Sequence, residues 1–165
     1  MRTTLLAAWF GVVHHRRSII PKATSLDLVG PLDPPDTARF KGKRVALYFG
    51  AGWCPACARF EPSLLAFKAA LDGDIELIYV SSDMPGASRA QALGLVEAKE
   101  PDDLKRRFGV WAGREVGTFG ARGRRSGVPA VVVLGEHDLQ EAAFLPAEAE
   151  GPSVLNNWPL DARWS

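Results

Sequence analysis

Cysteine and histidine are scarce in this chain of 165 residues, which contains two cysteines and three histidines. With no cysteine to spare for a framework of structural disulfides, the composition favours a reducing, intracellular compartment. A zinc site needs about four ligands, and the adjacent His14 and His15 and the distant His137 lack the spacing to supply them. We therefore expect no metal site and no organic cofactor.

Long apolar runs and a strong charge imbalance are also lacking. No stretch of about 18 or more apolar residues is present, so neither a transmembrane helix nor a membrane partner is expected. The net charge is +1, with 47% apolar and 24% charged residues, which is typical of a globular domain and does not point to nucleic acid. The length suits a single domain with modest extensions, and a monomer is the default expectation.

Acidic residues are absent from Met1 to Leu26, where an apolar run over residues 5–13 is flanked by hydroxyl and basic side chains. This composition is typical of a mitochondrial or plastid transit peptide and lacks the cleavage site of a secretory signal. An amphipathic helix packed on a cytoplasmic domain is the alternative. We therefore separate an N-terminal extension, residues 1–25, from a domain over residues 26–165.

Apolar patterning over that domain alternates between strand and helix. The pattern predicts buried strands at residues 43–49, 75–80 and 130–134 and helices at residues 55–71 and 101–108. Gly135 to Asp138 predicts a hairpin turn into an edge strand at residues 139–145. The expected fold is α/β, a mixed sheet with helices on both faces.

Both cysteines lie in Trp53-Cys54-Pro55-Ala56-Cys57, directly after the first predicted strand. Positions i and i+3 of a helix share a face, so the two thiols can form and break a disulfide without a change of fold. Pro55 at the first helical position places Cys54 at the helix start, where free N–H groups and the helix dipole favour a thiolate. This pattern is typical of a redox nucleophile. The alternatives are two buried inert thiols or a structural disulfide, which would stabilise little across so short a loop.

The residues around this motif resemble the thioredoxin superfamily, most closely its tryparedoxin and nucleoredoxin branch. The resemblance extends from about residue 26 to the C-terminus and implies a thioredoxin fold. It rests on residues 42–57, Pro62, Ser81-Ser82-Asp83, Val128-Pro129 and the aromatic–proline pair in Asn157-Trp158-Pro159.

The resemblance also implies roles for individual residues. Cys54 matches the attacking thiol and Cys57 the resolving thiol, while Pro129 matches a cis proline beside the disulfide. A trans proline that begins a strand is the alternative for Pro129. The substrate-binding residues implied in this way are Trp53, Pro55, Val128 and Pro129.

Two residues near the cysteines depart from the family pattern. Tyr48 stands where many thioredoxins have a buried carboxylate. Tryparedoxin-like proteins also have a tyrosine at this position. The proton acceptor for Cys57 is therefore left unassigned. Ala56 stands where the closest relatives have a second proline. It frees a backbone N–H near the sulfurs, so we expect a more oxidising couple than in a Pro-Pro version.

Residues 111–125 form an additional segment between the second predicted helix and Val128-Pro129. The segment is rich in glycine and predicts a mobile loop that emerges near the active site. Its basic side chains indicate a recognition loop for an acidic partner, phosphate or RNA, with a functionless insertion as the alternative. These side chains are Arg114, Arg122, Arg124 and Arg125, against a single Glu115.

The function predicted from these residues is that of a thiol-disulfide oxidoreductase. Cys54 attacks a protein disulfide, Cys57 resolves the mixed disulfide, and an upstream reductase or low-molecular-weight thiol restores the dithiol. The alternative is a structural or assembly subunit that binds partners through the basic loop and the N-terminal arm. A peroxide-reducing relative is disfavoured because no peroxidatic motif is present.

Overall fold

The computed structural model describes residues 40, 42–71, 73–135 and 139–159. Within this part of the chain, five strands form one mixed sheet in the order β3-β2-β1-β4-β5. The strands are β1 (Arg44–Gly50), β2 (Ile75–Ser81), β3 (Val96–Glu97), β4 (Ala130–Leu134) and β5 (Glu141–Leu145). The central strand β1 pairs parallel with β2 and antiparallel with β4.

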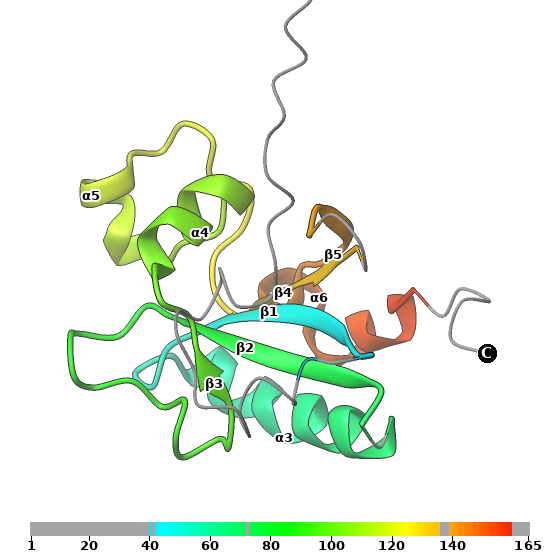
Figure 1. Ribbon diagram of the computed structural model, residues 1–165. Helices are drawn as coiled ribbons and strands as arrows, with labels where there is room; N and C mark the ends of the chain where they lie inside the picture. The colour runs from blue at the N-terminus through cyan, green and yellow to red at the C-terminus, as the bar shows by residue number, and fades with distance from the viewer. Residues whose placement is uncertain (1–39, 41, 72, 136–138, 160–165) are drawn as a thin grey trace, which may run out of the picture.

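Helices cover both faces of this sheet, which confirms the predicted α/β arrangement (Figure 1). The helix α4 packs on one face, and α3 packs on the other together with α6 and the 3₁₀-helix η3. The bounds are α3 (Pro55–Ala70), α4 (Pro101–Phe108), η2 (Gly113–Glu115), α5 (Val116–Phe119), α6 (Ala147–Glu150) and η3 (Gly151–Asn157).

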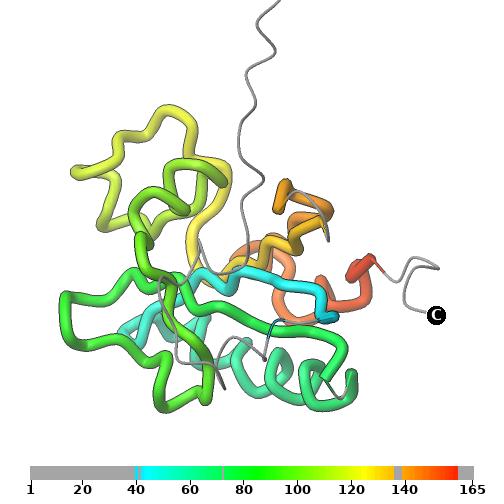
Figure 2. Tube along the Cα trace, in the orientation of Figure 1, coloured from blue at the N-terminus to red at the C-terminus, as the bar shows by residue number. Residues whose placement is uncertain are grey.

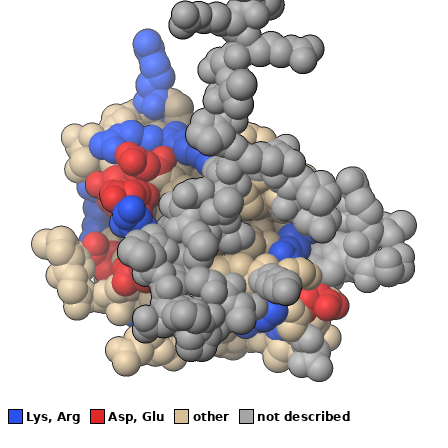
Figure 3. Space-filling model, in the orientation of Figure 1, with Lys and Arg blue, Asp and Glu red and all other residues tan. Residues whose placement is uncertain are grey.

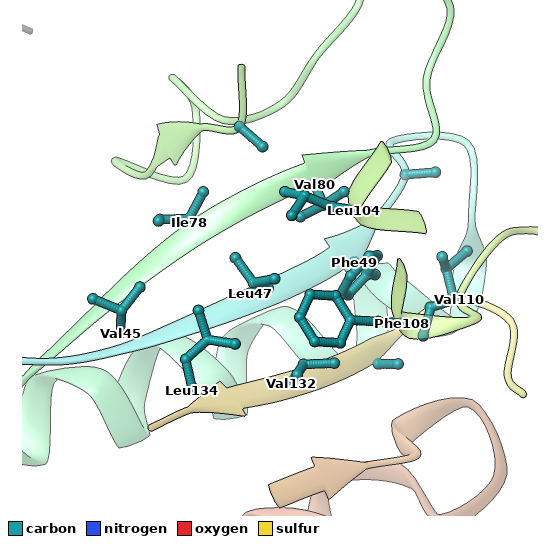
Figure 4. Close-up of a cluster of buried hydrophobic side chains, with 14 of the residues drawn as sticks. Val45, Leu47, Phe49, Ile78, Val80, Leu104, Phe108, Val110, Val132 and Leu134 are labelled. Atoms are coloured by element: carbon teal, nitrogen blue, oxygen red, sulfur yellow. The ribbon is translucent and has the colours of Figure 1, made fainter. Parts of the chain in front are cut away.

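The alternation of side chains along β1 divides the core into two halves. Val45, Leu47 and Phe49 point toward α4, where they meet Leu104 and Phe108 (Figure 4). The ring centroids of Phe49 and Phe108 are 6.4 Å apart in an edge-on arrangement. Because both faces of β1 are buried, this strand holds its C-terminal end rigidly in the middle of the sheet.

The opposite half of the core lies under α3. Tyr48 of β1 packs against Phe60 of α3 and Tyr79 of β2, with ring centroids 6.0 and 5.6 Å away. Trp158, in the predicted aromatic–proline pair, is buried in the same half and lies 5.1 Å from Phe67. Trp158 is therefore part of the domain core.

Most of the element boundaries expected from the sequence are confirmed. The helix at residues 101–108 and the strand at residues 130–134 have the predicted bounds, and β5 is an edge strand. That strand begins at Glu141 because Leu139 has a φ of 52° and the pairing with β4 is irregular near Leu134. Residues 136–138 of the predicted turn and residues 1–25 lie outside the described residues.

Residues 111–125 differ from the prediction of an irregular mobile loop, because they contain η2 and α5. The two ends of the segment are joined by a bridge between Val110 and Ser126, and the Trp111 N–H donates to the Ser126 carbonyl at 3.3 Å. The chain thus returns to the point beside α4 from which it left (Figure 2). We call residues 111–125 the insertion.

Contacts distant in sequence explain the order of the insertion. The buried Lys105 Nζ of α4 lies 2.7 Å from Glu115 Oε1, and Glu115 Oε2 accepts from the Ala112 N–H at 2.7 Å. Trp111 is buried and lies 5.6 Å from the Phe119 ring. The Glu115 carboxylate therefore holds the segment against α4, and the aromatic pair packs the segment on itself.

No helix among the described residues has the length and apolar character needed to cross a membrane.

Candidate active site

Three chain segments meet at one edge of the sheet because of the strand directions. The C-terminal ends of the parallel strands β1 and β2 lie side by side, and the antiparallel β4 begins there, with Phe49 opposite Ala130. The loop after β1 therefore faces the residues that precede β4. The Val128–Pro129 peptide bond in that position is cis, as predicted.

Cys54 forms the N-cap of α3, with Pro55 as the first helical residue. The backbone N–H of Cys57 donates to the Cys54 Sγ at 3.2 Å. The same sulfur lies 3.6 Å from the Val128 carbonyl oxygen. The Cys54 sulfur is thus held at the start of α3, a position from which a thiol can act as the nucleophile of the site.

Cys57 lies one turn inside α3 and is fully buried, whereas Cys54 is 6% exposed. Burial, and then the hydrogen bond with Cys54, raise the pKa of the Cys57 thiol well above its ordinary value. Both thiols are free. Cys57 is therefore a neutral thiol at rest and must lose its proton before it can attack a disulfide.

Trp53, 43% exposed, stands beside the cysteines in an orientation fixed by hydrogen bonds. Its Nε1–H donates to the Ser82 carbonyl oxygen at 3.1 Å. The neighbouring Gly52 N–H donates to Asp83 Oδ1 at 2.7 Å, and the Tyr79 hydroxyl donates to the other oxygen of Asp83 at 3.1 Å. The residues that follow β2 thus hold the loop that carries the motif.

Arg114 of the insertion lies on the Trp53 ring, which confirms that the insertion comes near the cysteines. Its guanidinium carbon is 3.8 Å from the ring centroid, and its Nη2 donates to the Ser82 carbonyl oxygen at 3.1 Å. A guanidinium over an aromatic face is attracted by the ring electrons. Arg114 therefore helps to fix the orientation of Trp53.

Two other arginines of the insertion form contacts within the domain. Arg124 donates to the Trp111 carbonyl at 2.9 Å and lies 3.7 Å from Glu148 Oε1. Arg125 donates to both oxygens of Glu141, at 2.8 and 2.6 Å. Arg122 is exposed. Around α4 and α5, basic and acidic side chains are interspersed (Figure 3). A role of Arg114, Arg122, Arg124 and Arg125 in recognition stays a prediction.

A cavity of about 360 Å³ opens beside Cys54 and brings together most of the predicted substrate-binding residues. Trp53, Pro55 and Val128 line it, while Pro129 is buried behind them. Two charged residues that the sequence did not single out, Arg59 and Glu148, also line the cavity.

Glu148 supports the backbone beside the cis proline. Its Oε2 accepts the Gly127 N–H at 2.7 Å, and a Cβ at Gly127 would collide with the same carboxylate. The role of Glu148 depends on the return of the chain from β5, so no local pattern indicates it.

Glu61 is the second feature that sequence reasoning missed. This buried carboxylate accepts a hydrogen bond from the Tyr48 hydroxyl at 3.2 Å through Oε1. Its other oxygen lies 3.2 Å from Arg89 Nη2. The spacing of one helical turn from Cys57 was the available signal, since i and i+4 lie on one helix face.

The described residues contain no group of three or more His, Cys, Asp or Glu side chains placed to hold a metal ion. His14, His15 and His137 lie outside the described residues.

A family model described as thioredoxin-like matches residues 42–138. The chain belongs to the thioredoxin-like family. Its relatives place it near the tryparedoxin and nucleoredoxin branch of the thioredoxin superfamily, as the motif predicts. This thioredoxin-like chain is 31% identical over 137 residues to nucleoredoxin-like protein 1 of Mus musculus, a match that covers 73% of this chain and 57% of that protein. It is 41% identical over 44 residues to probable nucleoredoxin 1 of Arabidopsis thaliana, which is 26% of this chain and 8% of that protein.

Solved structures show the same fold. The TM-score is 0.50 with a thioredoxin of Wuchereria bancrofti, at 24% identity over 74% of this chain and 84% of that one. It is 0.51 with tryparedoxin I of Leishmania major, at 20% identity over 74% of this chain and 82% of that one. The thioredoxin fold expected from the sequence is thus confirmed.

Proposed function

We propose that this thioredoxin-like protein is a thiol-disulfide oxidoreductase that reduces disulfides of protein substrates through Cys54 and Cys57. The observation that carries the proposal is the position of the Cys54 sulfur. It accepts the Cys57 N–H at the start of α3 and borders the open cavity beside Val128. A helix start favours the thiolate, and the cavity gives a disulfide access to it.

The reaction follows from these positions. The Cys54 thiolate attacks one sulfur of the substrate disulfide, which forms a mixed disulfide and releases the first substrate thiolate. Cys57 then loses its proton and attacks the Cys54 sulfur, which forms the Cys54–Cys57 disulfide and releases the second substrate thiol. An external dithiol, from a reductase or a low-molecular-weight thiol, reduces that disulfide. No metal or organic cofactor takes part in these steps.

Protein substrates are expected to bind in an extended form along the cavity. The edge of Trp53 offers an apolar surface, and the backbone before the cis Pro129 lies beside the attacking sulfur. Arg59 and Glu148 add one basic and one acidic side chain to the lining of the cavity. These features support a polypeptide segment with mixed polar and apolar contacts as the substrate.

Reduction of insulin by dithiothreitol tests the proposal. The full chain should accelerate precipitation of the insulin B chain, while Cys54→Ser should be inactive. Turnover equal to the dithiothreitol background, with the fold retained, would refute the oxidoreductase. That result would favour the alternative of a domain that only binds partners.

A further inference from the structure

The fully buried thiol of Cys57 needs a proton acceptor within reach, and the position where many thioredoxins have a carboxylate is occupied by Tyr48. The Tyr48 ring extends from β1 under α3, where it packs against Phe60, and its hydroxyl is near enough to Cys57 for each group to affect the pKa of the other. The hydroxyl lowers the pKa of Cys57, whereas burial raises that pKa by a larger amount. A neutral tyrosine cannot itself keep a proton from a thiol.

A carboxylate from another element lies directly behind this hydroxyl. Glu61 of α3 is 4% exposed, and its Oε1 accepts the Tyr48 O–H at 3.2 Å. Gly50 leaves the space for this contact, since a Cβ there would lie 2.8 Å from the Tyr48 hydroxyl oxygen. A buried carboxylate is costly without partners, so its placement one turn from Cys57 calls for a physical reason.

The opposite oxygen of the same carboxylate leads toward solvent. Glu61 Oε2 lies 3.2 Å from Arg89 Nη2, and the Arg89 side chain is 35% exposed. Arg89 compensates the charge of the ionised carboxylate. Tyr48, Glu61 and Arg89 therefore form a continuous series of polar groups that leads to the surface, and Glu61 lies one helical turn from Cys57 on the same helix.

We propose that Glu61 accepts the proton of Cys57 through the Tyr48 hydroxyl when Cys57 resolves the mixed disulfide. The inference rests on the proposed function. The Cys57 S–H bond breaks and its proton forms a new O–H bond on Tyr48, while the former Tyr48 O–H proton passes to Glu61 Oε1. Tyr48 is neutral before and after the transfer, in agreement with a pKa that burial raises far above its ordinary value.

The electrons and protons balance over the complete step. The Cys57 thiolate forms a bond to Cys54 Sγ, and the bond between Cys54 and the substrate sulfur breaks. The substrate thiolate leaves with the electron pair and takes a proton from water. Glu61 then returns its proton to solvent on the side of Arg89. The two cysteines are oxidised and the substrate disulfide is reduced.

A second hydroxyl–carboxylate pair, Tyr79 and Asp83, lies near the first. The Tyr79 hydroxyl donates to Asp83 Oδ2 at 3.1 Å, and Asp83 also holds the Gly52 N–H. Three groups therefore surround Glu61 and Cys57: Tyr48 from β1, Tyr79 from β2 and Arg89 from the segment after β2. Asp83 lies behind Tyr79. Tyr48 is the group among them that both influences the pKa of the Cys57 thiol and donates a hydrogen bond to Glu61.

The reaction of the reduced full chain with 5,5′-dithiobis(2-nitrobenzoate) separates the two thiols in time. Attack by Cys54 releases the first thionitrobenzoate, and resolution by Cys57 releases the second, so stopped-flow absorbance shows two phases. Glu61→Gln should leave the first phase unchanged and slow the second about 100-fold at neutral pH, within the range of general-base effects. The rate of the slowed phase should rise tenfold per pH unit, because Cys57 must then lose its proton to hydroxide.

Tyr48→Phe keeps the Glu61–Arg89 pair and provides a second variant that does not alter the buried charge. It should slow the second phase as Glu61→Gln does, and the double variant should be no slower than either single variant. Glu76→Gln is the matched control, because Glu76 is a buried carboxylate of β2 paired with Lys43 and Lys68. Both phases of this control should equal those of the parent.

Several results would overturn the inference. If the parent releases two equivalents and the second phase is unchanged in Glu61→Gln, the role of Glu61 is refuted while the proposed function stands. A second phase slowed by Asp83→Asn and not by Glu61→Gln would assign the proton to the other pair. A parent that releases only one equivalent would refute the proposed function, whatever Glu61 does.

Discussion

Arg114 and Trp53 share one hydrogen-bond acceptor across the border between the insertion and the active site. The guanidinium lies 3.8 Å from the indole centroid, and both side chains donate to the Ser82 carbonyl oxygen at 3.1 Å. The exposed aromatic surface beside the cysteines is therefore set by a residue outside the shared family motif.

Removal of this contact should weaken the reaction with proteins. A cation–π contact at a partly exposed site contributes about 0.5–1 kcal/mol, so Arg114→Ala should lower kcat/KM for insulin about two- to fivefold. Arg106→Ala removes a guanidinium that lies on Phe119 instead, 4.9 Å from that ring, and serves as the control. Equal losses in both variants would show that Arg114 acts through the stability of the insertion.

Alkylation of the reduced protein should modify Cys54 before Cys57. Cys57 is fully buried and its pKa is raised, so the fraction of reactive thiolate at Cys57 is very small at mildly acidic pH. Iodoacetamide labelling followed by peptide mass spectrometry measures the order. Faster modification of Cys57 would reverse the roles of the two thiols.

Substitution of the resolving thiol should trap the intermediate. Cys57→Ser leaves the Cys54 sulfur able to attack and removes the group that releases the substrate, so mixed disulfides with partner proteins should accumulate. Cys54→Ser should trap none. Non-reducing electrophoresis compares the two, and similar amounts of linked protein from both would contradict the mechanism.

Ala56→Pro should make the couple more reducing. The substitution removes a backbone N–H near the sulfurs, which destabilises the Cys54 thiolate and hence the reduced form. We expect the potential to fall by about 30 mV, which corresponds to about 1.4 kcal/mol for two electrons. Equilibration with glutathione buffers measures this change, and a potential that rises would contradict the expectation.

Substitution of Arg122 tests whether the insertion recognises substrates by electrostatic attraction. Arg122→Ala should slow the reaction with an acidic protein disulfide and leave a small neutral disulfide unaffected. The difference should vanish above about 0.1 M salt, where the Debye length is about 10 Å. Equal rates with both substrates at low salt would indicate that Arg122 has no part in recognition. Arg124 and Arg125 are unsuitable for this test, since they pair with Glu148 and Glu141.

Features set by local chemistry were predictable from the sequence. The helix α4 begins at Pro101 and ends before Gly109, whose φ of 70° suits a helix terminus, so its bounds follow from neighbouring residues. The pair of cysteines follows from a short motif, and the cis proline was implied by the family resemblance that Val128-Pro129 helps to carry. These signals lie within a few residues of the feature that they predict.

The features that escaped prediction depend on residues far apart in the sequence. The order of the insertion comes from Lys105 and Glu115, and glycine content alone suggested the opposite. The proton acceptor for Cys57 stayed unassigned because Tyr48 occupies the family position on β1, whereas the proposed acceptor, Glu61, comes from α3 and reaches the site behind the tyrosine ring. A charged residue on a helix looks exposed until the packing partners of that helix are known.

The bridge between Val110 and Ser126 brings the two ends of the insertion together. Its ends already lie beside one another, so a version of the chain without residues 111–125 needs only a short link to connect α4 to β4. Such a minimal chain should retain the sheet and both cysteines, yet it would lose the guanidinium that rests on Trp53. Loss of the segment would remove the buried Trp111 and Ala112 from the domain and would alter the surface that a substrate first meets.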